Sequence, residues 1–209
     1  LCLVSGGKKK IEPAIRDLSL SEPVRLNKVV KLGSRCFIVG GDRFQQAPLL
    51  VKEAGQAAQW VNLPANSTQQ EVYGIHAYPD GHLMAVGYDG SVYVSADSGQ
   101  QWIFEQHNSW REFQSVSLRS ADSAVVVGGL GFEKGFVQPL SIAGKGDVQT
   151  MEERNFEIAD VEFLTEKLGY LSGYGSSMKS TDGGHTWPFT PAINDCFKGM
   201  HWFSEAEGI

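Results

Sequence analysis

The sequence predicts an all-β fold built from a repeated unit, and three observations support this prediction. Short apolar segments that alternate as strands do recur about every 43 residues. Each segment is followed by a turn and by a second apolar segment that ends in glycine. The motif Ser-x-Asp-x-Gly-x-x-Trp occurs twice. Such repetition favours an architectural role, because a catalytic constellation seldom needs a second copy along one chain.

The composition is that of a folded, acidic and glycine-rich chain. Its 209 residues are 42% hydrophobic and 20% charged, which is ordinary for a globular protein with a sizeable core. The 24 glycines exceed the usual share of roughly 7% and recur in short turns. The formal net charge of −6 gives no reason to expect nucleic acid or an anionic membrane as partner, because both require clustered lysines and arginines.

The first residues resemble the end of an export signal. LCLVSGGKKK joins an apolar run, small residues and a basic start. We therefore expect residues 1–10 to be the remnant of a signal and 11–23 a linker, with the protein exported to the periplasm, cell envelope or extracellular space. A lipoprotein signal would need a cysteine where Gly6 stands, so membrane attachment is expected only if the chain is lipidated.

Metal and cofactor sites are not predicted. Cys2, Cys36 and Cys196 form no CxxC pattern, and the five histidines lack metal-ligand spacing. Export would allow Cys36 and Cys196 to pair, with buried free thiols as the alternative. His76 and His201 stand at equivalent places in two units, and we expect both to pack within innermost strands.

The repeated unit has the size of a β-propeller blade. Five units are predicted to open on a strand, and these strands begin at Val29, Ile75, Val116, Val161 and Met200. The second unit gives four strands, at 74–78, 83–87, 91–95 and 102–106, separated by Pro-, Asp- and Gly-rich turns. The segment from Ala159 to Thr190 gives the same four. Four antiparallel strands in about 40 to 50 residues is the arithmetic of a blade.

The chain is thus predicted to hold four blades and the start of a fifth. Their expected bounds are 24–66, 67–110, 111–155, 156–195 and 196–209. Met200 to Ile209 supplies one strand and a turn, Glu205 to Gly208. Four blades would leave open sheet flanks, so we expect a fragment of a ring of six to eight blades.

The repeated motif is predicted to fasten neighbouring blades together. An aspartate in a turn can accept backbone N–H bonds, a glycine can take a left-handed conformation, and a tryptophan can fill the gap between sheets. The residues in these roles are Ser95, Asp97, Gly99 and Trp102 in the second unit, and Ser180, Asp182, Gly184, Thr186 and Trp187 in the fourth. The first unit has a stretched version ending at Trp60, and the third has no tryptophan.

These motifs resemble the Asp-box, or BNR repeat, of sialidases, sortilin-type receptors, xyloglucan-cleaving glycosidases and photosystem II assembly-factor-like propellers. The fuller patterns, GYLSGYGSSMKSTDGGHTW and HLMAVGYDGSVYVSADSGQQW, are most similar to the photosystem II assembly and stability factor-like family. The resemblance implies a propeller over nearly the whole chain from about Val24. It says little about function, because the box is structural in all these families.

The predicted function is that of a non-enzymatic exported scaffold. Such a scaffold would present a loop face to a protein partner, with a glycan as another possible ligand class. Trp110 and Arg111 join the second and third units, and an exposed Trp beside an Arg is typical of an interface. Arg43 and Phe44 form a second candidate. The alternative is that Trp110 packs against its own blade.

A glycoside hydrolase, of sialidase-like or xyloglucan-cleaving type, is the alternative function. No catalytic residue is assigned, because nucleophile elbows, P-loops and dinucleotide fingerprints are absent from the sequence. A sialidase-like site needs converging arginines, and a glycosidase needs two axial carboxylates. Carboxylates that could serve are Glu71, Glu157, Asp160 and Glu162. Small or apolar axial residues would exclude this chemistry, whereas paired carboxylates or three arginines would favour it.

Overall fold

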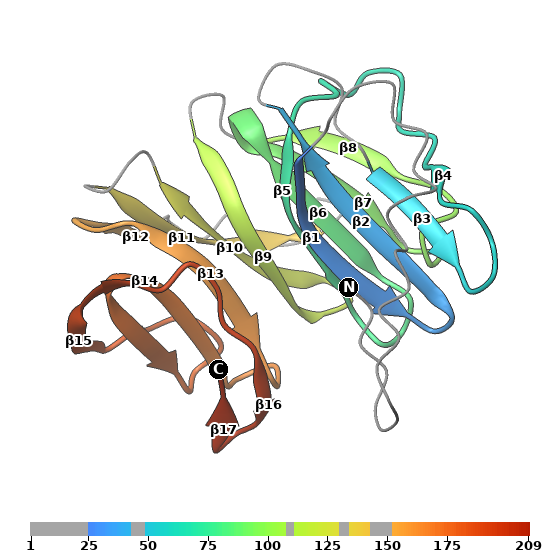
Figure 1. Cartoon of the computed structure of the whole chain (residues 1–209). Helices are drawn as coiled ribbons and strands as arrows, with labels where there is room; N and C mark the ends of the chain where they lie inside the picture. The colour runs from blue at the N-terminus through green and yellow to red at the C-terminus, as the bar shows by residue number, and fades with distance from the viewer. Residues whose placement is uncertain (1–24, 43–48, 108–110, 130–133, 143–151) are drawn as a thin grey trace.

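The computed structural model describes residues 25–42, 49–107, 111–129, 134–142 and 152–209, except for the side chains at 152–153, 176 and 189–196. Strands account for almost all of the described secondary structure (Figure 1). A short 3-10 turn covers Tyr88–Gly90. The expected signal remnant and linker lie outside the described residues. No helix in the described part is long and apolar enough to cross a membrane.

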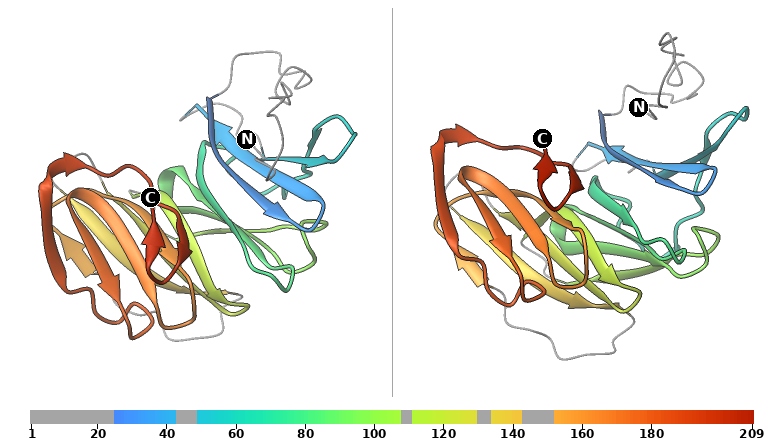
Figure 2. Two further views of the ribbon diagram at one scale, coloured as in Figure 1. Left: turned by 60° about the horizontal axis from the view of Figure 1, so that its bottom comes forward. Right: turned by 90° about the horizontal axis from the view of Figure 1, so that it is seen from below.

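The strands form successive antiparallel sheets in chain order, which Figure 2 shows fanned from blue to red. Three sheets have four strands, each paired with the next along the chain. The first sheet contains β1 (Arg25–Leu32), β2 (Arg35–Gly41), β3 (Leu49–Glu53) and β4 (Gln59–Trp60). The second contains β5 (Val72–Ala77), β6 (Leu83–Gly87), β7 (Ser91–Ser95) and β8 (Ile103–Gln106). The third contains β9 (Glu112–Ser120), β10 (Ser123–Gly129), β11 (Gly135–Ser141) and β12 (Glu152–Arg154).

The last part of the chain differs from the predicted pattern. The fourth sheet has three strands, β13 (Ile158–Phe163), β14 (Gly169–Ser180) and β15 (Phe189–Cys196). The predicted second and third strands both lie within β14, whose two halves pair with β13 and β15. Gly175, in the middle of β14, takes a left-handed φ of 66°, which glycine adopts without steric penalty.

The final unit is a hairpin rather than one strand and a turn. Its strands are β16 (Trp202–Ser204) and β17 (Glu207–Gly208), so the second strand begins inside the predicted turn. The Trp202 ring stacks on Tyr170 of β14 at 3.8 Å between centroids, which seats the hairpin on the fourth sheet. The prediction that His201 is packed within an innermost strand is wrong, because 61% of its side chain is exposed.

The first strands of the four larger sheets lie side by side, β1 against β5, β5 against β9 and β9 against β13. Each carries a one-residue bulge near its start, where the pairing register skips one position. A bulge re-aims the side chains of the strand that contains it. The skipped residues are Asn27, Tyr73, Gln114 and Ala159. These four residues therefore occupy equivalent positions in four sheets.

The glycine near the end of each second strand has a packing reason. A Cβ at this position would lie 2.0–2.1 Å from a carbonyl oxygen of the neighbouring first strand or of the residue before it. Only glycine fits such a close approach. The four glycines are Gly40, Gly87, Gly128 and Gly173, and the carbonyl groups they face belong to Arg25, Glu71, Glu112 and Glu157. The latter four residues are thus also equivalent.

Three hydrophobic clusters fill the spaces between neighbouring sheets. Phe37 of the first sheet packs with Ile75 and Tyr93 of the second. Met84 and Val86 of the second sheet pack with Val116 and Val126 of the third, and Val125 and Val127 of the third with Leu171 of the fourth. In β10, Val126 therefore faces one neighbour while Val125 and Val127 face the other. Burial on both faces explains why the second strands read as continuous apolar runs rather than alternating ones.

Candidate functional site

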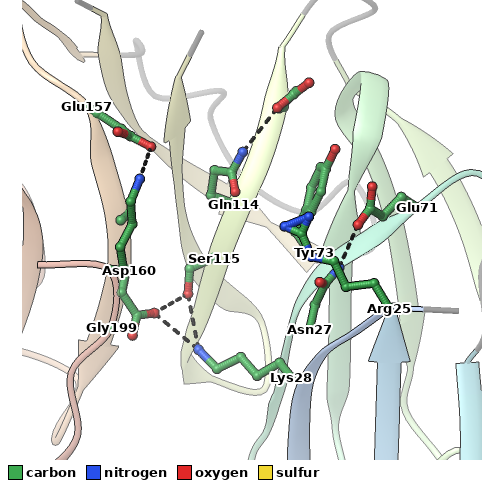
Figure 3. A pocket seen from close by; sticks show the side chains of 13 residues that line it. Arg25, Asn27, Lys28, Glu71, Tyr73, Gln114, Ser115, Glu157, Asp160 and Gly199 are labelled. Carbon is green, nitrogen blue, oxygen red and sulfur yellow. Dashed lines mark hydrogen bonds and ion pairs between the residues drawn. The ribbon is translucent and has the colours of Figure 1, made fainter. Parts of the chain in front are cut away.

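A polar pocket of about 420 Å³ lies where the first strands begin (Figure 3). This volume is within the usual range of ligand sites, roughly 300–1,000 Å³. All four first strands contribute, together with the segment that precedes β16. The lining residues are Arg25, Asn27, Lys28, Glu71, Tyr73, Glu112, Gln114, Ser115, Glu157, Ala159, Asp160, Lys198 and Gly199. They include both sets of equivalent positions, because each sheet repeats the same bulged geometry.

A charged cluster joins the first, third and fourth sheets within the pocket. Lys28 Nζ lies 3.1 Å from Asp160 Oδ1 and 3.3 Å from Ser115 Oγ. The Ser115 hydroxyl donates to the same Asp160 oxygen. The other Asp160 oxygen accepts the backbone N–H of Met200 at 3.1 Å. Asp160 is buried, and both of its carboxylate oxygens accept hydrogen bonds from the chain itself. It therefore holds the pocket residues in place and does not present a free carboxylate.

The three glutamates that precede or begin β5, β9 and β13 each accept a side-chain hydrogen bond. Asn27 Nδ2 donates to Glu71 Oε1 at 3.0 Å, and Gln114 Nε2 donates to Glu112 Oε2 at 3.1 Å. Lys198 Nζ donates to Glu157 Oε1 at 2.9 Å. Glu71 is 3% exposed. The pocket thus combines four carboxyl groups with three cationic side chains, Arg25, Lys28 and Lys198.

Two further titratable groups, His76 in β5 and Glu162 in β13, lie further along the first strands than the residues that line the pocket. His76 Nδ1 accepts the backbone N–H of Leu118 at 3.0 Å. Burial, together with the charge of Lys28, lowers the pKa of His76 to about 4, although Asp160 opposes the shift. Burial raises the pKa of Glu162, which His201 and the Trp202 backbone N–H partly offset. His76 is therefore neutral at pH 7 and serves as a hydrogen-bond acceptor between sheets.

The two Ser-x-Asp-x-Gly motifs make nearly the same hydrogen bonds. In the second sheet Ser95 Oγ donates to Asp97 Oδ1 at 2.9 Å and accepts the N–H of Gly99 at 2.8 Å. Asp97 Oδ1 also accepts the N–H groups of Gln100 and Gln101. The indole of Trp102 donates to the Gly99 carbonyl at 3.2 Å. All of these hydrogen bonds lie within the motif and stabilise its turn.

The fourth-sheet motif differs in the bonds made at Thr186. Ser180 Oγ donates to Asp182 and accepts the Gly184 N–H, as Ser95 does in the second sheet. Thr186 donates to Asp182 through its hydroxyl at 2.7 Å as well as through its backbone N–H at 3.0 Å. These bonds from Thr186 hold the pKa of Asp182 well below its usual range. Gln101 stands in the place of Thr186 in the second sheet and donates only its backbone N–H to Asp97.

The tryptophans of both motifs pack between sheets. Trp102 contacts Phe37 of the first sheet edge-on at 6.3 Å. Trp187 meets Phe163 edge-on at 5.8 Å and belongs to the cluster that includes Val125 of the third sheet. In contrast Trp60, in the stretched first copy, is 47% exposed. The two complete motifs therefore lie at boundaries between sheets.

The pocket and the motifs lie at opposite ends of the strands. Ser98, in the first motif, donates its N–H to Gly81 in the turn that follows β5. Gly183, in the second, donates to Lys167 in the turn that follows β13. Both turns lie beyond the far ends of first strands whose beginnings form the pocket. The motifs thus stabilise the scaffold at a distance from the pocket.

The predicted interface residues are only partly described. Trp110, Arg43 and Phe44 lie outside the described residues. Arg111 places its guanidinium 5.3 Å from the centre of the Phe136 ring in its own sheet. Cys36 is disulfide-bonded, and the side chains of the other two cysteines lie outside the described part. Cys36 is therefore not the buried free thiol that was the sequence-based alternative.

The described arginines do not converge at the pocket as a sialidase-like site requires. Arg25 lines the pocket, whereas Arg35 lies over Phe37 and Arg119 bonds to the Gly183 carbonyl and Ser123. Arg154 donates to the Trp187 carbonyl in the fourth sheet. No group of three His, Cys, Asp or Glu side chains in the described residues could hold a metal ion.

Solved structures with a similar fold are propellers. The structure matches the RRP9 WD40 repeats with a TM-score of 0.62 at 11% identity, over 85% of this chain and 57% of that chain. It matches an ancestral GH74 enzyme with a TM-score of 0.54 at 14% identity, over 78% of this chain and 23% of that chain. The chain has a β-propeller fold. The successive sheets described above are its blades.

A third similar structure is YCF48 bound to D1 peptide, with a TM-score of 0.49, 18% identity, and coverage of 88% of this chain and 74% of that chain. The propeller spans about half of the RRP9 repeats and a quarter of the GH74 enzyme. No protein-family model and no curated protein matches the sequence. Sequence identities at this level support a shared fold. Function has to be argued from the residues of the site.

Sequence reasoning identified part of the pocket. Of the four acidic candidates, Glu71, Glu157 and Asp160 line it, and Glu162 lies one step along β13. Lys28, Ser115 and Glu112 were missed. A usable signal existed, because the segments EVYGI, EFQSV and EIADV share a glutamate, an apolar residue, two variable residues and another apolar residue. Aligning them places the three glutamates at one level of the propeller.

Proposed function

We propose that this propeller is a non-enzymatic scaffold that binds a protein partner at the end where the polar pocket opens. The observation that carries the proposal is that four blades contribute equivalent residues to one polar pocket. The connections between blades reach their first strands at this same end. Partners commonly dock where loops gather around a rigid scaffold. A pocket assembled from four blades presents a preorganised surface, which reduces the ordering cost of binding.

The internal hydrogen bonds of the pocket support a binding role. Asp160 and Glu157 are each paired with a lysine of the same chain. Such pairing fixes side-chain positions, as a recognition surface requires. A glycan is a second ligand class that the amides of Asn27 and Gln114 would suit.

We further propose that the protein is exported and acts in the assembly or maturation of an envelope complex. The LCLVSGGKKK start and the likeness of the two complete motifs to assembly-factor-like propellers support this role. The disulfide at Cys36 agrees with an oxidising compartment. Fractionation of the native host tests it: recovery in the envelope or outside the cell supports export, and recovery in the cytosol contradicts it.

Site-specific photo-crosslinking tests partner binding. A benzoylphenylalanine in place of Tyr73, in the pocket wall, is compared in the native host with one in place of Gln100, in the motif turn at the other end. The expected result is a discrete protein adduct from position 73 that position 100 does not form. Absence of any adduct, or the same adduct from both positions, would contradict the proposal.

A glycoside hydrolase is the second candidate, because four carboxyl groups converge in the pocket and a glycosidase needs two. The sequence hypothesis made such carboxylates the sign that would favour an enzyme. Release of sugar from xyloglucan or from an aryl sialoside, abolished by Glu71→Gln or Asp160→Asn, would establish the hydrolase and overturn the scaffold. Under the proposed function, the wild type releases no more sugar than either variant.

A further inference from the structure

We infer that the polar pocket recognises a cationic side chain of the partner, a lysine or an arginine, through the carboxyl group of Glu71. This inference rests on the proposed function and names the part of the partner that enters the pocket. The negative charges of the pocket are compensated unequally. Asp160 has the ammonium of Lys28 and Glu157 has that of Lys198. These two carboxyl groups are therefore satisfied by the chain itself.

Glu71 is compensated differently. It is 3% exposed, and its Oε1 accepts a hydrogen bond from the neutral amide of Asn27. Within the described residues no cation lies within ion-pair distance of Glu71, and the side-chain hydrogen bond found there goes to Oε1 and not to Oε2. A carboxylate that is largely shielded from water is stabilised by an opposite charge and by hydrogen bonds. An incoming N–H cation restores both, and charge-assisted hydrogen bonds of this kind are about twice as strong as neutral ones.

The surroundings of Glu71 suit an extended cationic side chain. Glu112, at the equivalent position of the next blade, adds a second carboxyl group to the same pocket. Tyr73 of β5, two residues after Glu71, lines the same wall of the pocket with an aromatic ring (Figure 3). A cavity of about 420 Å³ has room for one lysine or arginine side chain.

Arg25 allows the cationic ligand to be distinguished from an anionic one. It begins β1 and is equivalent to Glu71, the residue before β5, and it is exposed. Its charge repels a cation at Glu71 weakly, because solvent screens it, whereas an anionic ligand would pair with it. Variants at the two positions therefore have opposite effects on affinity. Loss of Glu71 weakens the binding of a cationic ligand, and loss of Arg25 strengthens it.

The test is an NMR titration of the whole chain with single-residue probes. The probes are the Nα-acetyl amides of lysine, arginine, norleucine and glutamate. We expect the lysine and arginine amides to shift signals of Tyr73, and norleucine amide to shift none. Glu71→Gln weakens their binding about tenfold, equivalent to about 1.4 kcal/mol. Arg25→Ala tightens it about twofold to threefold. Glu105→Gln, which removes a carboxyl group from the outer strand β8, leaves it unchanged.

Each other result overturns the inference in a recognisable way. Equal binding of norleucine and lysine amides would exclude charge recognition, while crosslinking from position 73 would still support a protein partner. Preferred binding of glutamate amide, lost in Arg25→Ala, would show an anion site. Spermidine binding more than tenfold tighter than lysine amide would assign the pocket to a free polyamine. If Glu71→Gln fails to fold, the direction of the Arg25→Ala effect still decides between cation and anion.

Discussion

Nζ of Lys28 in the first blade lies 3.1 Å from Oδ1 of Asp160 in the fourth, so an ion pair between residues 132 positions apart connects the two blades. Ser115 of the third blade donates to the same aspartate. The lysine side chain is about one-third exposed and the aspartate is nearly buried. The pair therefore closes the arc of blades on the pocket side, where the hydrophobic clusters between neighbouring blades do not reach across.

Removing the cation of this pair should destabilise the propeller. Lys28→Met leaves Asp160 with neutral donors alone, and we expect the free energy of unfolding to fall by about 1–2 kcal/mol, less than for a fully buried pair because solvent screens Lys28. Urea denaturation measures the change. The control is Lys198→Met, which removes an exposed lysine paired with Glu157 and should change stability by less than about 0.5 kcal/mol. Equal effects of the two substitutions would contradict the prediction.

The tryptophans of the repeated motif should differ sharply in importance. Trp102 is 7% exposed and packs between two blades, whereas Trp60 is 47% exposed. We expect Trp102→Ala to lower the free energy of unfolding by about 3–5 kcal/mol, because it leaves a cavity against Phe37. Trp60→Ala should cost less than about 0.5 kcal/mol. Thermal and urea unfolding of both variants provide the comparison, and similar losses would disprove the role assigned to the motif.

Gly99 should tolerate a side chain less well than another left-handed glycine. Its φ is 82°, and a Cβ would lie 2.4 Å from the Phe37 ring of the neighbouring blade. Gly55 has a similar φ of 76° with open space around it. We expect Gly55→Ala to lower the free energy of unfolding by about 1 kcal/mol from backbone strain alone. Gly99→Ala should lower it by about 2–4 kcal/mol, since the blades must also move apart. The difference between the two losses of unfolding free energy measures the contribution of the contact between Gly99 and Phe37 of the neighbouring blade.

His76 should make stability fall in mild acid. Its pKa is lowered from 6.5 to about 4 in the folded state, so between these values the unfolded chain binds the extra proton. Stability then rises with pH across this window and is lost as the pH falls from 6.5 towards 4, by up to about 3 kcal/mol.

The comparison variant for this effect is His76→Gln, which keeps a side-chain acceptor for the Leu118 N–H without a titrating ring. Urea midpoints measured from pH 4 to 7 should be less pH-dependent in the variant than in the wild type. Parallel pH profiles would mean that groups other than His76 govern acid stability.

The strands of the second blade fall within one or two residues of their predicted bounds, because Pro79, Gly81 and Gly90 stand in its turns. In the fourth blade Gly175 stands between two halves of one strand, where a turn between two strands was predicted. A glycine that can take a left-handed conformation stands both in the turns of the second blade and inside the long strand of the fourth. The sequence therefore did not distinguish a turn between two strands from an irregular residue within one strand.

The pocket was only partly predictable for a different physical reason. Glu71, Glu157 and Asp160 could be proposed because each adjoins a first strand. Their convergence depends on the bulge that recurs in four strands, and a bulge is a property of paired backbones. Lys28 could not be matched with Asp160 from local pattern, because nothing within either strand specifies a partner three blades away.

The sequence by itself determined the repeating blade, through the apolar period, the glycines that allow close backbone contact and the two motifs whose hydrogen bonds are local. These features depend on residues that are close together in the chain, so they can be recognised from the sequence alone. The tertiary structure decided which carboxyl groups are neutralised and which is left with a neutral partner. Asp160 meets Lys28 and Glu71 meets Asn27 only after the blades pack and bring the starts of their first strands together.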